Sequence, residues 1–261
     1  MSAPRLTTRR LSTVMLALAA FAFVVPAAPT LAGAPGWSSE RVQGSGNIKS
    51  ETRAIGHFNG VAMSLPGKME LRIGNSEGIT IETDDNLLPL IETVVEDGTL
   101  HVRPSKRHLN VETRRLKVVV TAKAIDNLAL GGSGSIDADA LRAPKMHIDL
   151  GGSGAINVKG IESESLSVNV GGSGNLKVGA GNAPKLSVSL AGSGDIDMGR
   201  VQSLDASVNI AGSGDAKISV RDRLNATIAG SGDVNYYGDP KVSRTVIGSG
   251  GTNRLGAVAS R

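Results

Sequence analysis

The sequence has 261 residues, with 28 lysines and arginines, 24 aspartates and glutamates, and no cysteine. The absence of cysteine excludes disulfides, cysteine-ligated metals and a lipid anchor on an N-terminal cysteine. Three of the arginines lie in the first ten residues, so residues 33–261 carry a net charge of only +1, and we expect no nucleic-acid partner.

The N-terminus has the three-part pattern of a secretory signal peptide. The early arginines precede an uncharged apolar run, residues 11–25, and small residues follow around Ala32. The apolar run is shorter than the ~20 residues that a membrane-spanning helix needs. We therefore expect residues 1–32 to be removed, with cleavage as late as residue 34 as the alternative. The mature protein is then periplasmic or secreted and retains no transmembrane segment.

We predict an N-terminal linker at residues 33–46 and a single domain at residues 47–261. The first part of the domain is irregular. Residues 94–102 indicate a β-hairpin with Asp97-Gly98 as its turn, and the alternation at Leu116, Val118 and Val120 indicates another strand. We expect this part to form N-terminal coils and to cover one end of the repeat array described next.

A Gly-Ser-Gly step recurs through the rest of the chain, at intervals of 20, 20, 20, 20, 18 and 18 residues. An isolated earlier copy lies at Ser45. The regular copies have their serines at Ser133, Ser153, Ser173, Ser193, Ser213, Ser231 and Ser249. Fixed self-similarity at this period is typical of a repeat architecture.

Hydrophobic residues alternate with polar ones on both sides of each step. Around Ser153, the apolar positions are Ile148, Leu150, Ile156 and Val158. A period of two indicates a strand with one buried face, so each repeat is a strand, a glycine corner, a second strand and a return loop. Stacking such units ~4.8 Å apart buries their apolar faces and gives an all-β parallel solenoid. An antiparallel sandwich is the alternative, but it does not require one corner every 20 residues.

The repeated serines are expected to form a structural ladder rather than a set of nucleophiles. Glycine permits a tight corner, and each hydroxyl can both donate and accept a hydrogen bond along the stack. A nucleophile elbow needs Gly-x-Ser-x-Gly between a strand and a helix. Ser135 replaces the second glycine after Ser133, and Ile247 replaces the first glycine before Ser249. We therefore expect no catalytic residue.

Asp195, Asp215 and Asp233 each follow a repeat serine by two residues, so they are expected to stack in consecutive coils. Adjacent like charges are unfavourable unless they are solvated, partly protonated or bridged by a cation. A solvated acidic row is the favoured interpretation, and a calcium site that stabilises the protein is the speculative alternative. The calcium-binding nonapeptide roll is excluded, because Ile136 occupies its aspartate position. No cofactor is expected.

The C-terminal end of the array is less regular. Arg244 occupies a position that is apolar in the other repeats, and residues 251–261 are largely polar. We expect this end either to be capped by its own tail or to pair with another subunit.

Several of these motifs resemble those of the autotransporter adhesin family with the head GIN domain. They are Phe58–Val61, Asp84–Pro89, Glu96–Leu100 and the iterated Gly-Ser-Gly, and the resemblance extends over residues 44–250. It implies a right-handed β-helix in the cell envelope or outside the cell, and it brings no catalytic residue set. The sequence has no C-terminal translocator barrel, so self-export is not expected.

Together these observations predict an exported structural or adhesive protein that is not an enzyme. Its partner would be a cell-surface glycan or an envelope protein, bound through repeated weak contacts. Two alternatives stay open. One is a polysaccharide-processing enzyme on the same scaffold, and the other is an envelope protein that assembles into homo-oligomers through the solenoid ends.

Overall fold

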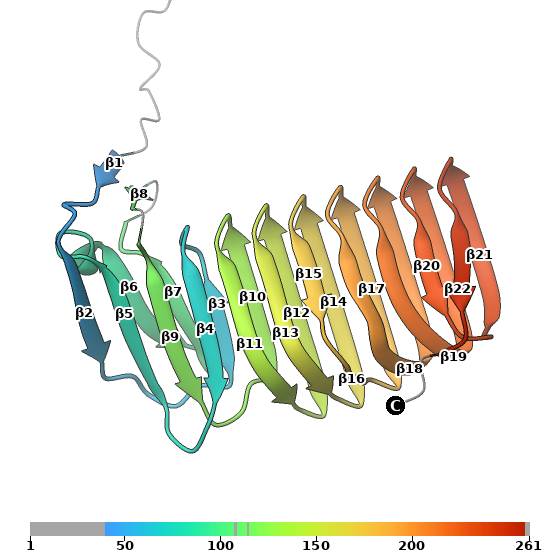
Figure 1. The fold of residues 1–261 in the computed structure, drawn as a ribbon, viewed down its shortest axis with the longest axis horizontal. Coiled ribbons are helices and arrows are strands. Elements are labelled where there is room, and N and C mark those ends of the chain that lie inside the picture. The colour runs from blue at the N-terminus through green and yellow to red at the C-terminus, as the bar shows by residue number, and fades with distance from the viewer. Residues whose placement is uncertain (1–39, 107–108, 114, 259–261) are drawn as a thin grey trace, which may run out of the picture. The chain divides into compact units, whose positions relative to one another are not determined.

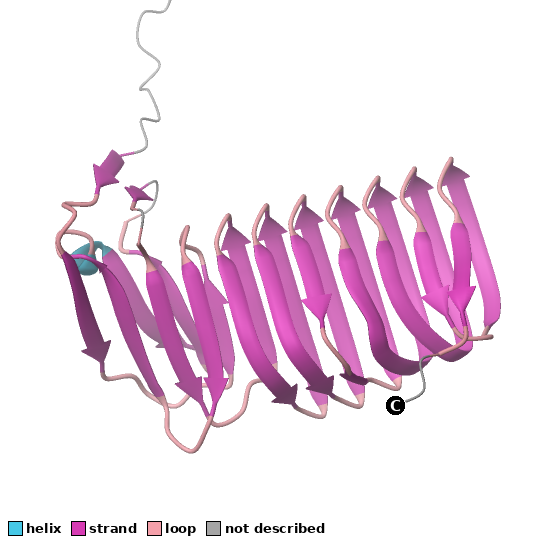
Figure 2. Cartoon of the chain, viewed as in Figure 1, coloured by secondary structure: helices cyan, strands magenta, loops and turns pink. Residues whose placement is uncertain are grey.

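A computed structural model describes residues 40–106, 109–113 and 115–258 of the chain. The predicted signal peptide, residues 1–32, lies outside the described residues. The described chain from Glu40 onward belongs to one compact unit. Most of it is β-strand, as Figure 2 shows, and its strands stack as parallel coils, which confirms the predicted solenoid (Figure 1).

Each coil contributes one strand to each of two faces, which we call the first and the second face. The first face contains β3 (Gly60–Met63), β7 (Thr99–Pro104), β10 (Asn127–Gly132), β12 (Lys145–Gly152), β14 (Ser165–Gly172), β17 (Lys185–Gly192) and β21 (Lys241–Gly248). The second face contains β4 (Lys68–Ile73), β9 (Lys117–Ala122), β11 (Ser135–Arg142), β13 (Ala155–Glu162), β15 (Asn175–Val178), β16 (Gly181–Asn182), β20 (Val234–Tyr237) and β22 (Thr252–Gly256). Two long strands, β18 (Ile196–Gly212) and β19 (Ala216–Gly230), run from the second face into the first.

The predicted inward rows form the core. Ile148, Val168 and Val188 lie opposite one another in consecutive parallel strands, and each side chain is 0% exposed. The rows after the corner are buried in the same way, as at Ile156 and Leu176. Each buried aliphatic side chain contributes about 1.5–3 kcal/mol relative to an exposed one, so the stack of rows supplies most of the driving force for folding.

The coils at the N-terminal end do not follow the chain in order. β3 lies between β7 and β10, and β4 lies between β9 and β11. The coil formed first in the sequence is therefore inserted between a later segment and the first regular repeat. The irregular region does form N-terminal coils, as predicted, but their order is one that the sequence pattern does not reveal.

Antiparallel strands close this end. β5 (Gly78–Asp84) pairs with β9, β2 (Ile48–Arg53) pairs with β5, and β6 (Ile91–Glu96) pairs with β7. The hairpin of β6 and β7 turns at Asp97-Gly98, with positive φ at both residues, as predicted. A short 3₁₀ helix, η1 (Leu88–Leu90), precedes β6.

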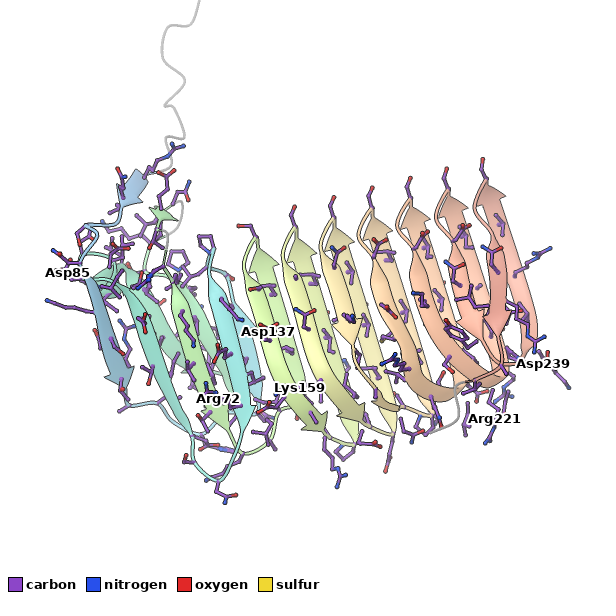
Figure 3. The ribbon with its side chains drawn as sticks, in the orientation of Figure 1. Arg72, Asp85, Asp137, Lys159, Arg221 and Asp239 are labelled. Carbon is purple, nitrogen blue, oxygen red and sulfur yellow. The ribbon has the colours of Figure 1, made fainter. Side chains whose placement is uncertain are left out.

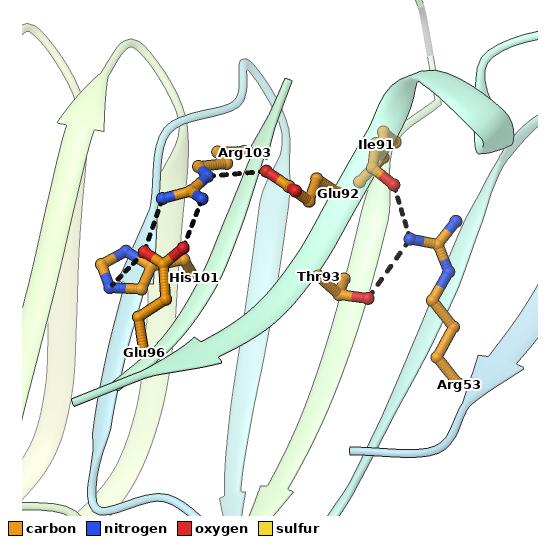
Figure 4. A network of polar contacts seen from close by, with 7 residues as sticks. All are labelled: Arg53, Ile91, Glu92, Thr93, Glu96, His101 and Arg103. Carbon is orange, nitrogen blue, oxygen red and sulfur yellow. Dashed lines mark hydrogen bonds and ion pairs between the residues drawn. The ribbon is translucent and has the colours of Figure 1, made fainter. Parts of the chain in front are cut away.

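Arg53 and Arg103 form polar contacts within the antiparallel strands that close this end (Figure 4). The Arg53 guanidinium donates to the carbonyl oxygens of Ile91, at 2.5 Å, and of Leu88, at 2.7 Å, and so ties β2 to the start of β6. The Arg103 guanidinium pairs with Glu96 at 2.7 Å and with Glu92 at 2.8 Å within the hairpin.

The isolated Gly-Ser-Gly copy within the predicted linker is structured and is not a coil corner. β1 (Glu40–Gln43) pairs with β8 (Leu109–Glu112), and Gly44-Ser45-Gly46 then contacts Asp84-Asp85-Asn86. The Ser45 hydroxyl donates to Asp85 at 2.6 Å, and the Gly46 amide donates to Asp84 at 2.6 Å. These contacts attach the N-terminal segment to the end of β5.

The opposite end of the solenoid is open within the described residues. All eight residues of β21 are exposed, and no described strand covers it. Arg244 lies opposite Ala226 in the inward row and is exposed, so the predicted break in the core is present.

Candidate functional site

The repeated serines lie at a corner whose geometry depends on glycine. At the corner around Ser173, Gly172 has a φ of 114°, and a Cβ on Gly174 would lie 2.6 Å from the carbonyl oxygen of Gly154 in the preceding coil. The Ser173 amide donates to the Gly152 carbonyl at 2.9 Å, and the equivalent bond recurs at Ser153, Ser193, Ser213, Ser231 and Ser249. The contacts between coils here run through the backbone, and the serine side chains are exposed. The hydroxyl ladder stays a prediction.

The predicted acidic row is aligned, and it has backbone partners. The Asp215 amide donates to the Asp195 carboxylate at 3.3 Å, and the Asp233 amide donates to the Asp215 carboxylate at 2.8 Å. The row continues at both ends, since Asn175 accepts from the Asp195 amide and Asp233 accepts from the Gly251 amide. Each carboxylate thus accepts the amide hydrogen of the next coil, which offsets part of the repulsion between neighbouring charges.

In the part of the chain that the structure describes, no group of three or more His, Cys, Asp or Glu side chains is arranged to hold a metal ion. No helix among the described residues is long and apolar enough to span a membrane.

Charged side chains upstream on the second face form what we call the paired cluster, part of which is labelled in Figure 3. Its members are Lys68, Glu70, Arg72, Lys117, Asp137, Asp139 and Lys159. Lys68 lies 2.8 Å from Asp137, and Lys159 lies 2.7 Å from Asp139. These ammonium groups hold the pKa of both aspartates below the ordinary value. Every charge in the paired cluster therefore has an opposite charge beside it.

A hollow of about 620 Å³ lies beside the Ser45 turn, and both of its carboxylates already have partners. Thr113 donates to Asp84 at 2.5 Å and, together with the Gly46 amide, lowers the pKa of that buried carboxyl. Glu112 pairs with Arg41 at 3.1 Å. This hollow belongs to the structural attachment of the N-terminal segment.

A second concavity arises where the repeat shortens from 20 to 18 residues. Asp197 of β18 lies opposite Lys217 of β19, but the next aligned pair is Gln202 with Ser219. Residues 198–201 therefore face a single residue, Ile218, and bulge from the second face. The strand of the preceding coil is also interrupted here, between β15 and β16.

We call the concavity at this bulge the basic groove, and it has a volume of about 440 Å³. Its lining residues are Lys177, Val178, Gly179, Asp197, Gly199, Arg200, Lys217 and Tyr237. Two glycines allow close packing here. A Cβ on Gly179 would lie 2.6 Å from the carbonyl oxygen of Lys159 in the preceding coil. A Cβ on Gly199 would lie 3.1 Å from Cδ of Lys217 and 3.2 Å from Cε2 of Tyr237, so these two side chains pack close to the bare glycine.

The basic groove has more positive than negative charge. Its one carboxylate, Asp197, accepts from the Gly199 amide at 3.2 Å and lies 3.6 Å from the ammonium group of Lys217. Lys177 and Arg200 are exposed, and neither forms an ion pair with another described residue. Sequence analysis missed this groove, although the change of interval after Ser213 marked its position.

Asp215→Asn tests the interpretation of the acidic row, because it keeps an acceptor oxygen and removes one charge. We expect its Tm to equal or exceed that of the wild type, since repulsion falls and the Asp233 amide keeps its partner. Asp215→Ala removes the acceptor and should cost about 0.5–1.5 kcal/mol of unfolding free energy. Thermal unfolding with and without calcium checks both. A calcium-dependent rise in Tm that Asp215→Asn abolishes would show instead that the row binds a cation.

Comparison with known proteins places this fold among solved structures of bacterial adhesin-like proteins. A Bacteroides fragilis protein named a putative adhesin is 21% identical, with a TM-score of 0.77 over 82% of this chain and 100% of its own. A Parabacteroides distasonis protein named a putative lipid binding protein is 26% identical, with a TM-score of 0.69 over 83% of this chain and 100% of its own. A second Parabacteroides distasonis protein, named a putative adhesin, is 21% identical with a TM-score of 0.64, over 83% of this chain and 100% of its own.

None of the curated proteins matches the sequence. The family model described as "putative auto-transporter adhesin, head GIN domain" matches residues 57–240, from the start of the first coil through β20. The match covers most of the stacked coils, including the repeat serines from Ser133 to Ser231, the acidic row and the basic groove. The chain belongs to the auto-transporter adhesin head GIN domain family.

Proposed function

We propose that the protein is an exported binding protein that attaches to an extended cell-surface glycan and does not catalyse a reaction. The observation that carries this proposal is the register of the outward side chains. Ser167, Ser187 and Ser207 lie opposite one another in consecutive strands of the first face. Such columns repeat one polar group every ~4.8 Å, which suits weak contacts with successive units of a polymer.

Family membership supports an adhesive role, and the signal-peptide pattern of residues 1–32 supports export to the periplasm or beyond. An envelope protein is the other partner that an adhesin would bind. One of the two Parabacteroides distasonis proteins is named a putative lipid binding protein, so a ligand screen should also include lipids.

Binding of residues 33–261 to an array of cell-surface glycans, with product analysis of every ligand bound, tests the proposal. We expect a polymer to be retained without cleavage. Because many contacts act together, we expect it to bind about 10²-fold more tightly than its own disaccharide. Release of a shortened product would show a polysaccharide-processing enzyme instead. Equal affinity for polymer and disaccharide would contradict multivalent attachment.

The open C-terminal end supports a second candidate function, which is self-assembly. β21 has an unpaired strand edge, and the large apolar side chains exposed at this end include Val242, Val246, Ile247 and Leu255. A second copy could add its own β21 and continue the sheet. Lys241 and Arg244 lie on the same strand and oppose this pairing by charge repulsion.

Sedimentation velocity over a range of protein concentrations tests self-assembly. The candidate predicts a dimer that Ile247→Lys abolishes. Ile73→Lys, at an exposed apolar residue on β4, is the matched control and should leave the dimer intact. A monomer at every concentration would exclude this second candidate.

A further inference from the structure

We propose that the basic groove is a subsite for a carboxylate-bearing sugar, so that the polymer the protein binds is an acidic polysaccharide. This inference rests on the proposed function and deepens it, since it names the ligand class and the residues that select it. Three properties of the basic groove carry the argument: its uncompensated charge, its shape and its position in the polar columns.

The charge of the basic groove is available to a ligand. Upstream on the same face, each cation of the paired cluster lies beside a carboxylate. In the groove, one carboxylate faces three cations, and Lys177 and Arg200 form no ion pair among the described residues. A guanidinium offers a planar pair of donors that matches a carboxylate, and an ammonium adds a second charged donor.

The shape of the basic groove suits a sugar ring. Its volume of about 440 Å³ lies within the ~300–1,000 Å³ typical of small-molecule sites. Because Gly199 has no side chain, the Tyr237 ring and the Lys217 stem pack directly against its backbone and line the groove. An amphipathic tyrosine can contact the C–H groups of a sugar while its hydroxyl stays hydrated.

The surroundings favour a sugar acid over a lipid headgroup. A bound lipid must also place its acyl chains on an apolar surface. The groove has little such surface, because Val178 and Tyr237 are its only large apolar side chains. The exposed large hydrophobic residues of the described chain, such as Ile73 and Ile247, do not line it.

The polar columns continue from the basic groove in both directions along the stack. Asn157 lies opposite Lys177 in the preceding coil, and Asn235 lies opposite Lys217 in the following one. A polysaccharide with one acidic unit in the groove can therefore place its neighbouring units over amide side chains, which hydrogen-bond to hydroxyl groups. The subsite thus lies within the repeated surface of the proposed function.

Titration of residues 33–261 with polygalacturonate, and with dextran as a neutral polymer, tests the subsite. We expect binding to polygalacturonate and at least tenfold weaker binding to dextran. The double variant Lys177→Gln/Arg200→Gln should lose at least tenfold in affinity for polygalacturonate, because it removes both unpaired cations. The matched control Arg142→Gln/Lys145→Gln removes the same charge from exposed positions outside the groove and should lose less than threefold.

Gly199→Leu separates shape from charge. It leaves the net charge unchanged and must displace the Lys217 and Tyr237 side chains that pack against Gly199, so it should weaken polygalacturonate binding at least tenfold. Circular dichroism of each variant verifies the fold. If Gly199→Leu does not fold, the comparison of the two double variants still decides the matter.

Three results would overturn the subsite. The first is equal affinity of the wild type for dextran and polygalacturonate. The second is equal loss in the two double variants. The third is a wild type that binds phosphatidylglycerol vesicles but not polygalacturonate, with Lys177→Gln/Arg200→Gln abolishing the vesicle binding. That result would identify a lipid headgroup as the ligand. If polymers on the glycan array bind multivalently and the groove variants do not change their affinity, the subsite is wrong and the proposed function stands. If no polymer binds, both fail.

Discussion

The close approach of successive backbones at the glycine corners is the constraint on which the rest of the structure depends. A Cβ on Gly174 would meet the carbonyl oxygen of Gly154 at 2.6 Å, and a Cβ on Gly152 would meet that of Gly132 at the same distance. Only glycine allows both this contact and the positive φ of the residue before each serine. Because every corner stacks directly on the one before it, the strands on both sides are held in register. The buried aliphatic rows and the exposed polar columns follow from that register.

Register also explains how the exposed charges are satisfied. The acidic row is stable because each aspartate reaches the amide of the next coil, an arrangement that requires the coils to repeat without slippage. The paired cluster uses the same alignment to place lysines beside aspartates. The basic groove forms where the alignment changes, at the bulge of residues 198–201, and Lys177 and Arg200 have no ion-pair partner among the described residues. A local break in the repeat thus produces the surface that we propose as the ligand subsite.

Much of the fold could be predicted from the sequence because the regular spacing of the repeat determines which residues lie opposite one another in successive coils. The spacing of the serines gives the coil, and the alternation around Ser153 gives its buried side. The inserted first coil could not be predicted, because β3 pairs with two strands that both come much later in the chain, β7 and β10. The role of Ser45 was hidden for a similar reason, since its partners Asp85 and Asn86 lie about 40 residues away. The interval after Ser213 identifies the shorter coil, but it does not show where within that coil the register shifts, so the shape of the basic groove could not be predicted.

The stability of two glycine-to-alanine variants within one corner tests the central constraint most directly. Gly171 and Gly174 flank Gly172-Ser173, and a Cβ on Gly171 would have no heavy atom closer than 4.0 Å, whereas one on Gly174 would meet a backbone oxygen. The position equivalent to Gly171 is already alanine in the next coil, at Ala191. By urea denaturation, Gly171→Ala should change the unfolding free energy by less than about 0.5 kcal/mol, and Gly174→Ala should lower it by about 1–3 kcal/mol. Equal stability of the two variants would contradict the claim that backbone approach at the corner holds the coils in register.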